Sequence, residues 1–257
     1  MRRALLTALA VLFVAAPAAE SAELSGRLVF CTGDDICRYF PEPRLEVAFV
    51  AAPGEANELR LTSHPDGVRV VDAGAAITTG TYCTPVSPNE AVCGPPAPSG
   101  LLATAFTGDA ADLAFADTGS VFLGRGRDHG VAQGASIDGG RGADRLISAA
   151  GVSLLTGAAG RDHLSGTNGE EVLTGGSGKD LLVARGGADT VEGGKGADLV
   201  AGGAGRDDIH AGSGDDLIHA TDPARDTVRC GRGDDRALVS ARDRVFGCER
   251  VSRRVDE

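Results

Sequence analysis

The sequence predicts an all-β protein whose main part is a parallel β-roll, a solenoid of short stacked strands, preceded by a small β domain. Two observations predict the roll. Residues 139–219 divide into nine consecutive nonapeptides without insertion or deletion. Each nonapeptide has glycine at its fourth position, an aliphatic residue at its eighth and, with one exception, an acidic residue at its sixth. A short period held in three columns is typical of a solenoid, whose repeats bury their apolar side chains against one another.

Taken in order, the chain begins with residues 1–22, which have the pattern of a secretory signal peptide. Arg2 and Arg3 precede an apolar run over residues 5–15, and Ala16-Pro17-Ala18 fits a cleavage site. The apolar run is shorter than the roughly 20 residues that a transmembrane helix needs. We therefore expect a cleaved signal peptide and a secreted, extracellular protein.

Residues 23–105 are expected to form a small β domain. Two alternating segments, 58–62 and 68–70, flank a Pro-Asp-Gly turn at residues 65–67, which predicts a hairpin because proline presets the turn and glycine takes its left-handed position. Three prolines between residues 95 and 98 then mark a break.

The six cysteines of an exported chain predict disulfides. Sequence alone leaves the pairing open, but local pairing is economical because short loops close at the least entropic cost. A zinc site is the alternative; the chain has no C-x-x-C motif and its histidines are scattered, so zinc is disfavoured. The local pairs are Cys31 with Cys37, Cys83 with Cys93, and Cys230 with Cys248.

The repeat is irregular on both sides of the nonapeptide block. Residues 106–138 carry a degenerate form: Asp128 lies 16 residues before Asp144, where two repeats require 18. We expect this segment to start the stack. After the block the phase slips by one residue near Pro223. The roll is therefore placed at residues 139–238.

Residues 239–257 are expected to form a C-terminal cap. A solenoid end exposes an open core and unpaired strand edges, which must be covered. A disulfide between Cys230 and Cys248 would strap this end closed.

Each nonapeptide is expected to be a glycine-rich turn followed by a short strand. Side chains alternate along a strand, so the eighth-position aliphatic residue faces inward and its two neighbours face outward. Two repeats then make one coil of 18 residues with a strand on each side. Strands on the same side are expected to stack in parallel about 4.8 Å apart.

Sorting the sixth positions by side gives two unequal acidic ladders. One side is unbroken, and its members are Asp144, Asp162, Asp180, Asp198 and Asp216. The other side has Ser153, Glu171, Asp189 and Asp207. Past the phase slip, Asp226 and Asp235 are expected to extend both ladders.

These ladders predict a bound cation. Like charges at strand spacing repel by roughly 3–4 kcal/mol per pair at an effective dielectric constant near 20. The block also contains 21 glycines in 81 residues, and ordering each costs about 0.5–1 kcal/mol more than ordering alanine. Calcium offsets both penalties, because it accepts carboxylate and backbone carbonyl oxygens in a flexible shell, whereas magnesium suits a carbonyl-rich cage less well.

The repeats at residues 139–147, 175–183 and 193–201 closely resemble the RTX (haemolysin-type) calcium-binding nonapeptide G-G-x-G-x-D-x-U-x. The flanks, including residues 51–57, are also similar to secreted bacterial calcium-binding proteins. The resemblance implies a parallel β-roll that holds several Ca²⁺ ions between adjacent turns of one side, through the sixth-position aspartates and turn carbonyls. It implies good sites at 144/162, 162/180, 180/198, 198/216 and 189/207. Ser153 and Glu171 depart from the pattern and weaken the second side.

The net charge and the absence of a nucleophile motif limit the classes of function that the sequence supports. The net charge of −11 argues against nucleic acid and anionic membranes as partners and suits a cation. No nucleophile motif is present, so we expect a calcium-dependent structural or binding protein and no enzyme. The alternatives are a calcium-dependent adhesin or cell-surface component, and a secreted hydrolase with its chemistry in the N-terminal domain.

One outward column of the roll is apolar. Leu181, Leu199 and Leu217 occupy the seventh position of successive repeats on one side. Ordinary packing between neighbouring strands explains such a column. It is also a candidate surface for a cell-surface partner or a second copy of the chain.

Overall fold

The computed structural model describes residues 22–29, 44–50, 58–64, 67–72, 77–79, 83–87, 90–93, 102–106, 110–117, 119–151 and 153–254. Every regular element of this part of the chain is a β-strand, so it offers no helix that could cross a membrane. The predicted signal peptide and the Cys31–Cys37 pair lie outside the described residues.

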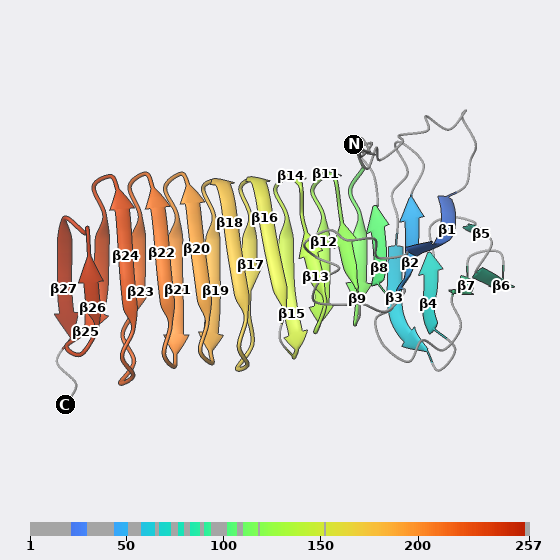
Figure 1. Ribbon diagram of the computed structural model, residues 1–257. Helices are drawn as coiled ribbons and strands as arrows, with labels where there is room; N and C mark the ends of the chain where they lie inside the picture. The colour runs from blue at the N-terminus through green and yellow to red at the C-terminus, as the bar shows by residue number, and fades with distance from the viewer. Residues whose placement is uncertain are drawn as a thin grey trace, which may run out of the picture.

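The strands form two sheets that stack along one long axis (Figure 1). Sheet A runs in the order β26 (Arg244–Phe246), β24 (Thr227–Arg232), β22 (Asp208–Ser213), β20 (Thr190–Lys195), β18 (Val172–Gly178), β16 (Leu154–Gly160), β13 (Ser136–Asp138), β10 (Ser120–Phe122), β8 (Leu102–Phe106), β2 (Arg44–Val50), β1 (Ala22–Val29) and β5 (Ile77–Thr79). Two further strands, β11 (Arg125–Gly126) and β14 (Arg141–Gly142), pair with each other, and β14 also pairs with β16.

Sheet B forms the opposite side of the solenoid. Its order is β27 (Arg250–Arg254), β25 (Arg236–Ser240), β23 (Leu217–Ala220), β21 (Leu199–Ala204), β19 (Leu181–Gly186), β17 (His163–Ser165), β15 (Arg145–Ala150), β12 (His129–Gln133), β9 (Leu113–Ala116), β3 (Glu58–His64), β4 (Gly67–Asp72), β7 (Glu90–Cys93) and β6 (Cys83–Ser87).

The register confirms the two-sided coil. Within the nonapeptide block each strand pairs in parallel with the strand two repeats later, so that Leu146 lies opposite Leu164 and Leu164 opposite Leu182. The predicted all-β class and parallel roll are therefore confirmed, with about 8 turns in the solenoid.

The core is a single file of side chains between the two sheets. All nine eighth-position aliphatic residues are 0% exposed, as the alternation predicts; they are Leu146, Leu155, Leu164, Leu173, Leu182, Val191, Val200, Ile209 and Ile218. Val228 and Ala237, the register partners of Ile209 and Ile218, continue the file beyond the phase slip. One aliphatic side chain per strand makes a thin core, so the turns must contribute much of the cohesion.

The fourth-position glycines are required by the distance between coils. A Cβ atom added at Gly178 would lie 1.3 Å from the carbonyl oxygen of Gly160 in the preceding coil, and Gly178 has φ of +147°. The same contact recurs down the column, for example between Gly196 and Gly178. Close contact between coils therefore explains glycine at most positions of the column, but not at Gly151 and Gly169, where an added Cβ atom would lie at least 3.4 Å from its neighbours.

The coils change length outside the regular block. The length of a coil is the number of residues between register partners on neighbouring strands. It is 16 from His129 to Arg145, 19 from Asp208 to Thr227 and 17 from Thr227 to Arg244. Residues 110–138 therefore start the stack with shorter coils, and the phase slip is absorbed without breaking either sheet.

The N-terminal strands join the two sheets through parallel pairs, β2 with β8 and β3 with β9, and the pairs β1–β2, β3–β4, β4–β7 and β6–β7 beyond them are antiparallel. The predicted hairpin is present, since β3 pairs with β4 from Leu59–Asp72 to His64–Gly67. The backbone of Cys83 lies directly opposite that of Cys93 in the β6–β7 pair.

Candidate metal centre

The sixth-position carboxylates lie in two single files at the turns, and every one of them is buried, at 6% exposed or less. The long ladder precedes the strands of sheet B and consists of Asp128, Asp144, Asp162, Asp180, Asp198, Asp216 and Asp235. The short ladder precedes the strands of sheet A and consists of Glu171, Asp189, Asp207, Asp226 and Asp243.

One carboxylate oxygen of each aspartate links it to the preceding coil. The backbone N–H of Asp144 donates to Oδ1 of Asp162 at 2.9 Å, and that of Asp162 donates to Oδ1 of Asp180 at 2.8 Å. The short ladder has the same kind of bond, for example from the backbone N–H of Asp189 to Oδ1 of Asp207 at 3.0 Å. Each bond satisfies a buried amide that the turn leaves without a sheet partner.

The other carboxylate oxygen is buried and has no hydrogen-bond donor within the described part of the chain. This holds for Oδ2 of Asp128, Asp144, Asp162, Asp180, Asp189, Asp198, Asp207, Asp216, Asp226 and Asp235. Buried polar atoms in proteins are nearly always bonded, and each exception needs an explanation. Ten exceptions at equivalent positions indicate that the turns are built for a partner that the polypeptide does not supply.

Burial raises the pKa of these carboxyl groups. The pKa of Asp162 rises to about 7, mainly because burial penalises the charged form. The hydrogen bond from the Asp144 amide lowers this pKa, whereas the carboxylates of Asp180 and Asp144 raise it. Burial likewise raises the pKa of Asp189 to about 7 and that of Asp180 to about 6. A charged ladder is therefore unfavourable at neutral pH unless a cation neutralises it.

The glycines at the first position leave room beside the free oxygens. A Cβ atom added at Gly157 would lie 2.6 Å from Oδ2 of Asp162 and 2.7 Å from the carbonyl oxygen of Gly175. At Gly175 the corresponding distances are 2.7 Å to Oδ2 of Asp180 and 2.5 Å to the Gly193 carbonyl oxygen. Carboxylate and carbonyl oxygens thus border the same space on successive coils.

This donor set fits calcium. Calcium prefers hard oxygen ligands and accepts carboxylates and carbonyls together. Within the described residues, no three His, Cys, Asp or Glu side chains gather into a metal-binding group. Each ladder is a single file, so a cation between two coils would take its remaining ligands from turn carbonyls or water.

The start of the short ladder differs from the rest. Thr167, which occupies the second position of its repeat, donates to Glu171 from its hydroxyl at 2.6 Å and from its amide at 3.0 Å. The Ser148 hydroxyl donates to Oγ of Ser153 at 3.0 Å. The protein's own donors therefore satisfy Glu171 and Ser153, the two departures that the sequence identified.

The structure adds members that sequence reasoning missed. Asp112 and Asp128 begin the long ladder, with the Asp112 amide donating to Oδ1 of Asp128 at 2.8 Å. The sequence identified the 16-residue spacing between Asp128 and Asp144 and placed the start of the stack here, but it did not assign these aspartates to the acidic ladders. At the other end Asp243 closes the short ladder, because its two oxygens accept from the amides of Asp226 and Ser240.

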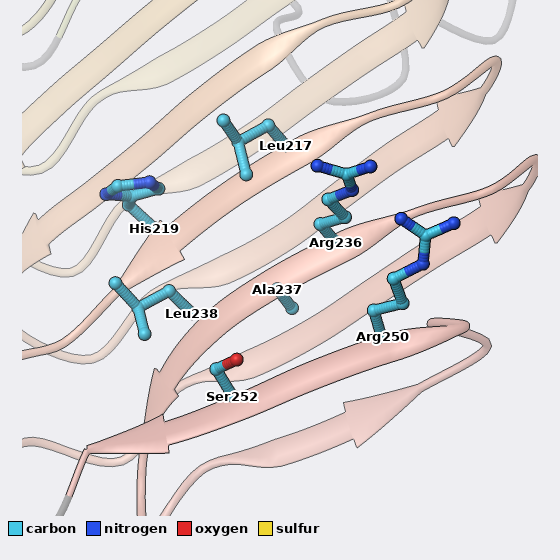
Figure 2. Close-up of a pocket in the computed structure, with 7 residues that line it drawn as sticks. All are labelled: Leu217, His219, Arg236, Ala237, Leu238, Arg250 and Ser252. Carbon is cyan, nitrogen blue, oxygen red and sulfur yellow. The ribbon is translucent and has the colours of Figure 1, made fainter.

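The outer face of sheet B carries the predicted leucine column. Leu181, Leu199 and Leu217 are register partners on successive coils, and Leu199 and Leu217 are 39% and 40% exposed. Figure 2 shows the C-terminal end of this face, where Leu217, Arg236 and Arg250 form one row beside His219, Leu238 and Ser252. These residues and Ala237 line a shallow groove of about 370 Å³.

The C-terminal end brings Cys230 and Cys248 together. Their Cα atoms are 5.1 Å apart, a separation that a disulfide spans. Cys230 is fully buried at the end of the core file.

Comparison with known proteins identifies the repeats. Residues 136–155, 149–182 and 183–218 match the family model of the RTX calcium-binding nonapeptide repeat (4 copies). No curated protein and no solved structure gives a significant match to the chain. The matched residues coincide with the regular coils and end before the phase slip.

Proposed function

We propose that this chain, an RTX repeat protein, folds on calcium and is held together by calcium ions between successive coils of its roll. RTX repeats imply a calcium-binding β-roll. The observation that carries the proposal here is the file of buried Oδ2 atoms that have no donor among the described residues; those of Asp162, Asp180 and Asp198 also lie beside a turn carbonyl at a first-position glycine. A divalent cation neutralises two neighbouring carboxylates and so removes the repulsion between coils.

The proposed sites lie between neighbouring aspartates of one ladder. They are 144/162, 162/180, 180/198, 198/216 and 189/207, with Asp226 and Asp235 extending the short and long ladders. Ser153 and Glu171 bind no calcium in this scheme, because hydroxyl and amide donors already satisfy their oxygens.

The experiment is a calcium titration of the purified mature protein by calorimetry, with circular dichroism before and after chelation. The proposal predicts several ions per chain and a gain of β-structure on calcium binding. Calcium binding without a change in the spectrum would support the sites but would contradict the proposal that the roll folds when calcium binds.

We further propose export and a structural or binding role without catalysis. RTX repeat proteins are typically secreted, and residues 1–22 have the pattern of a signal peptide. Cytosolic calcium is too scarce to order the roll, whereas external calcium is sufficient. In an oxidising compartment Cys230 and Cys248 would form the strap at the C-terminal end.

A second candidate function, calcium-dependent binding of a cell surface or of another chain, is favoured by the outer face of sheet B. Its two outward columns contain no Asp or Glu from β15 to β27, although the protein carries a net charge of −11. The leucine column lies in the middle of this face.

This second function is tested with Leu199→Asp. Loss of calcium-dependent binding to cells or polysaccharide, or loss of self-association in sedimentation at millimolar calcium, would support it. Unchanged behaviour in both assays would leave the face without a partner role.

A further inference from the structure

The outer faces of the two sheets carry opposite charges. From β13 to β22 the two outward columns of sheet A contain Asp138, Glu192 and Asp208 and no Lys or Arg. From β15 to β27 the two outward columns of sheet B contain arginine and histidine and no Asp or Glu. The Asp, Glu, Lys and Arg side chains of each of these faces therefore share one sign, and the two signs are opposite.

Both faces also expose aliphatic side chains inside the charged pattern. Leu154 and Val172 are register partners on sheet A and are 43% and 37% exposed. Leu199 and Leu217 are register partners on sheet B and are 39% and 40% exposed. Among the described residues between β15 and β23, these four are the large apolar side chains that are exposed. Each face therefore has an apolar centre that another surface can cover.

The charges flank the apolar centre at nearly the same separation on both faces. On sheet A, Asp138 and Asp208 lie four strands apart, with the exposed aliphatic pair between them. On sheet B, Arg145 and Arg236 lie five strands apart, with the leucine column between them. Figure 2 shows Leu217 and Arg236 as neighbours at one end of this pattern. The two separations differ by one strand spacing of about 4.8 Å, which the long side chain of arginine can span.

Charges on both faces are available to a partner. Arg145 and Arg236 on sheet B make no ion pair within the part of the chain that the structure describes, and neither does Glu192 on sheet A. Asp208 is engaged by Arg229, which donates to its Oδ1 at 2.5 Å. Glu192 is therefore the acid of sheet A that a cation of another chain reaches without competition from an ion pair.

A second copy of the chain can cover the leucine column in two ways. If the sheet B faces of two chains met about a two-fold axis, arginines and histidines of one chain would face those of the other without a carboxylate between them, and this costs binding energy. If sheet B met sheet A of the second chain, its arginines would face Asp138, Glu192 and Asp208. Charge thus favours contact between unlike faces.

We propose that the outer face of sheet B docks on the outer face of sheet A of a second copy, with the leucine column against Leu154 and Val172. The inference rests on the proposed calcium function, because both faces exist only in the folded roll, and it names the partner of the sheet B face. Contact between unlike faces leaves one free face at each end, so further chains can add. A face two side chains wide is smaller than the roughly 800 Å² per partner of a stable interface, so the association is weak.

The test is sedimentation of the full mature chain at millimolar calcium and about 0.1–1 mM protein. Leu199→Asp blocks the face of sheet B and Val172→Arg blocks that of sheet A, because each adds the charge that the opposing face already carries. The wild type should form species that grow with concentration, and each variant alone should sediment as a monomer. An equimolar mixture of the two variants should form a dimer and nothing larger, because each variant keeps one intact face. Ala204→Asp, which adds the same charge as Leu199→Asp at a turn, is the control and should assemble like the wild type.

Several results would overturn the inference. Assembly of Val172→Arg alone would show that sheet B pairs with sheet B, and a mixture that stays monomeric would show that the two faces do not fit. Raising the salt concentration from about 0.05 M to about 0.5 M should reduce assembly, so assembly that is insensitive to salt would reject the charge argument.

Circular dichroism at saturating calcium separates this inference from the proposed function. A wild-type chain that has its calcium-dependent β-sheet spectrum but stays monomeric would overturn the inference alone. A wild-type chain that binds no calcium would reject the proposed function itself. If a variant lacked the wild-type spectrum, Leu217→Asp or Leu154→Arg on the same column would replace it.

Discussion

Each sixth-position aspartate carries out two separable tasks. Oδ1 accepts a backbone amide from the preceding coil, whereas Oδ2 faces the gap without a donor in the described residues. The sequence identified these positions from their period, but it contained no sign of the amide bond. That bond depends on the turn closing to within hydrogen-bond distance of the neighbouring coil, which is a property of the stack.

At this scale we predict unequal effects on the two ladders. Asp180→Ala removes a ligand from the gaps on both sides and leaves the buried Asp162 amide without its acceptor. It should eliminate both adjacent calcium ions and lower the free energy of unfolding in calcium by at least about 2 kcal/mol. Calorimetry and urea denaturation measure the two effects.

Ser153→Ala is the matched change on the other side. It removes hydroxyl contacts with Ser148 and the Gly134 amide and should cost about 1 kcal/mol or less, with no loss of calcium. Equal effects of the two substitutions on calcium stoichiometry would contradict the two-sided arrangement.

The raised pKa values predict an inverted pH dependence for the calcium-free protein. Asp162 has a folded pKa of about 7 against an ordinary value of 3.8, so between these pH values the folded chain binds more protons than the unfolded chain. Stability without calcium is then fully present below pH 3.8 and falls as pH rises towards 7. Protein depleted of calcium on a chelating resin should retain more β-structure at pH 5 than at pH 8, as measured by circular dichroism. A β-sheet content of the calcium-depleted protein that rises with pH would contradict this ionisation scheme.

At the scale of the element, how far a strand could be predicted depends on how regular its coil is. The strands from β15 to β23 follow from the eighth-position aliphatics and the turn glycines, and the hairpin of β3 and β4 follows from its Pro-Asp-Gly turn. The sequence also indicated the 16-residue spacing before Asp144 and a stack that starts there. The exact pairing of β12 and the partners of β1 and β2 did not follow, because their register depends on contacts between distant segments.

The fourth-position glycine sets the spacing between turns. Gly178→Ala would place a Cβ atom 1.3 Å from the Gly160 carbonyl oxygen at a φ of +147°, so neighbouring coils must separate. We expect this substitution to lower the free energy of unfolding, measured by urea denaturation in the presence of calcium, by at least about 3 kcal/mol.

Gly134→Ala is the control for backbone strain alone. Gly134 has φ of +77° and no atom within 4 Å of the added Cβ. The Gly134→Ala substitution should lower the free energy of unfolding by only about 1–2 kcal/mol. Similar losses in the two variants would mean that close packing of the coils is not what selects glycine.

At the scale of the whole molecule, the solenoid is closed at its C-terminal end by side chains that satisfy the last ladder members. Asp243 accepts two amides, and the Asp235 amide donates to Glu249 at 2.8 Å. The Cα atoms of Cys230 and Cys248, which lie 18 residues apart in the chain, are 5.1 Å apart at this end. At this end, acidic side chains accept the last free amides of the two ladders, and the segment between Cys230 and Cys248 forms a short loop.

Removal of the proposed strap should destabilise this end without affecting calcium. Replacing Cys230 and Cys248 together by serine should lower the free energy of unfolding by about 3 kcal/mol, because a loop of this length then gains freedom in the unfolded chain. Calcium stoichiometry should remain that of the wild type. An unchanged unfolding midpoint would show that the cap does not depend on the disulfide.

Circular dichroism at pH 8 during calcium removal and return tests the central claim most directly, because it asks whether cations hold the coils together. The account predicts that the β-sheet spectrum of the calcium-loaded chain collapses on chelation and returns when calcium is restored in excess. A spectrum that stays the same throughout would contradict it.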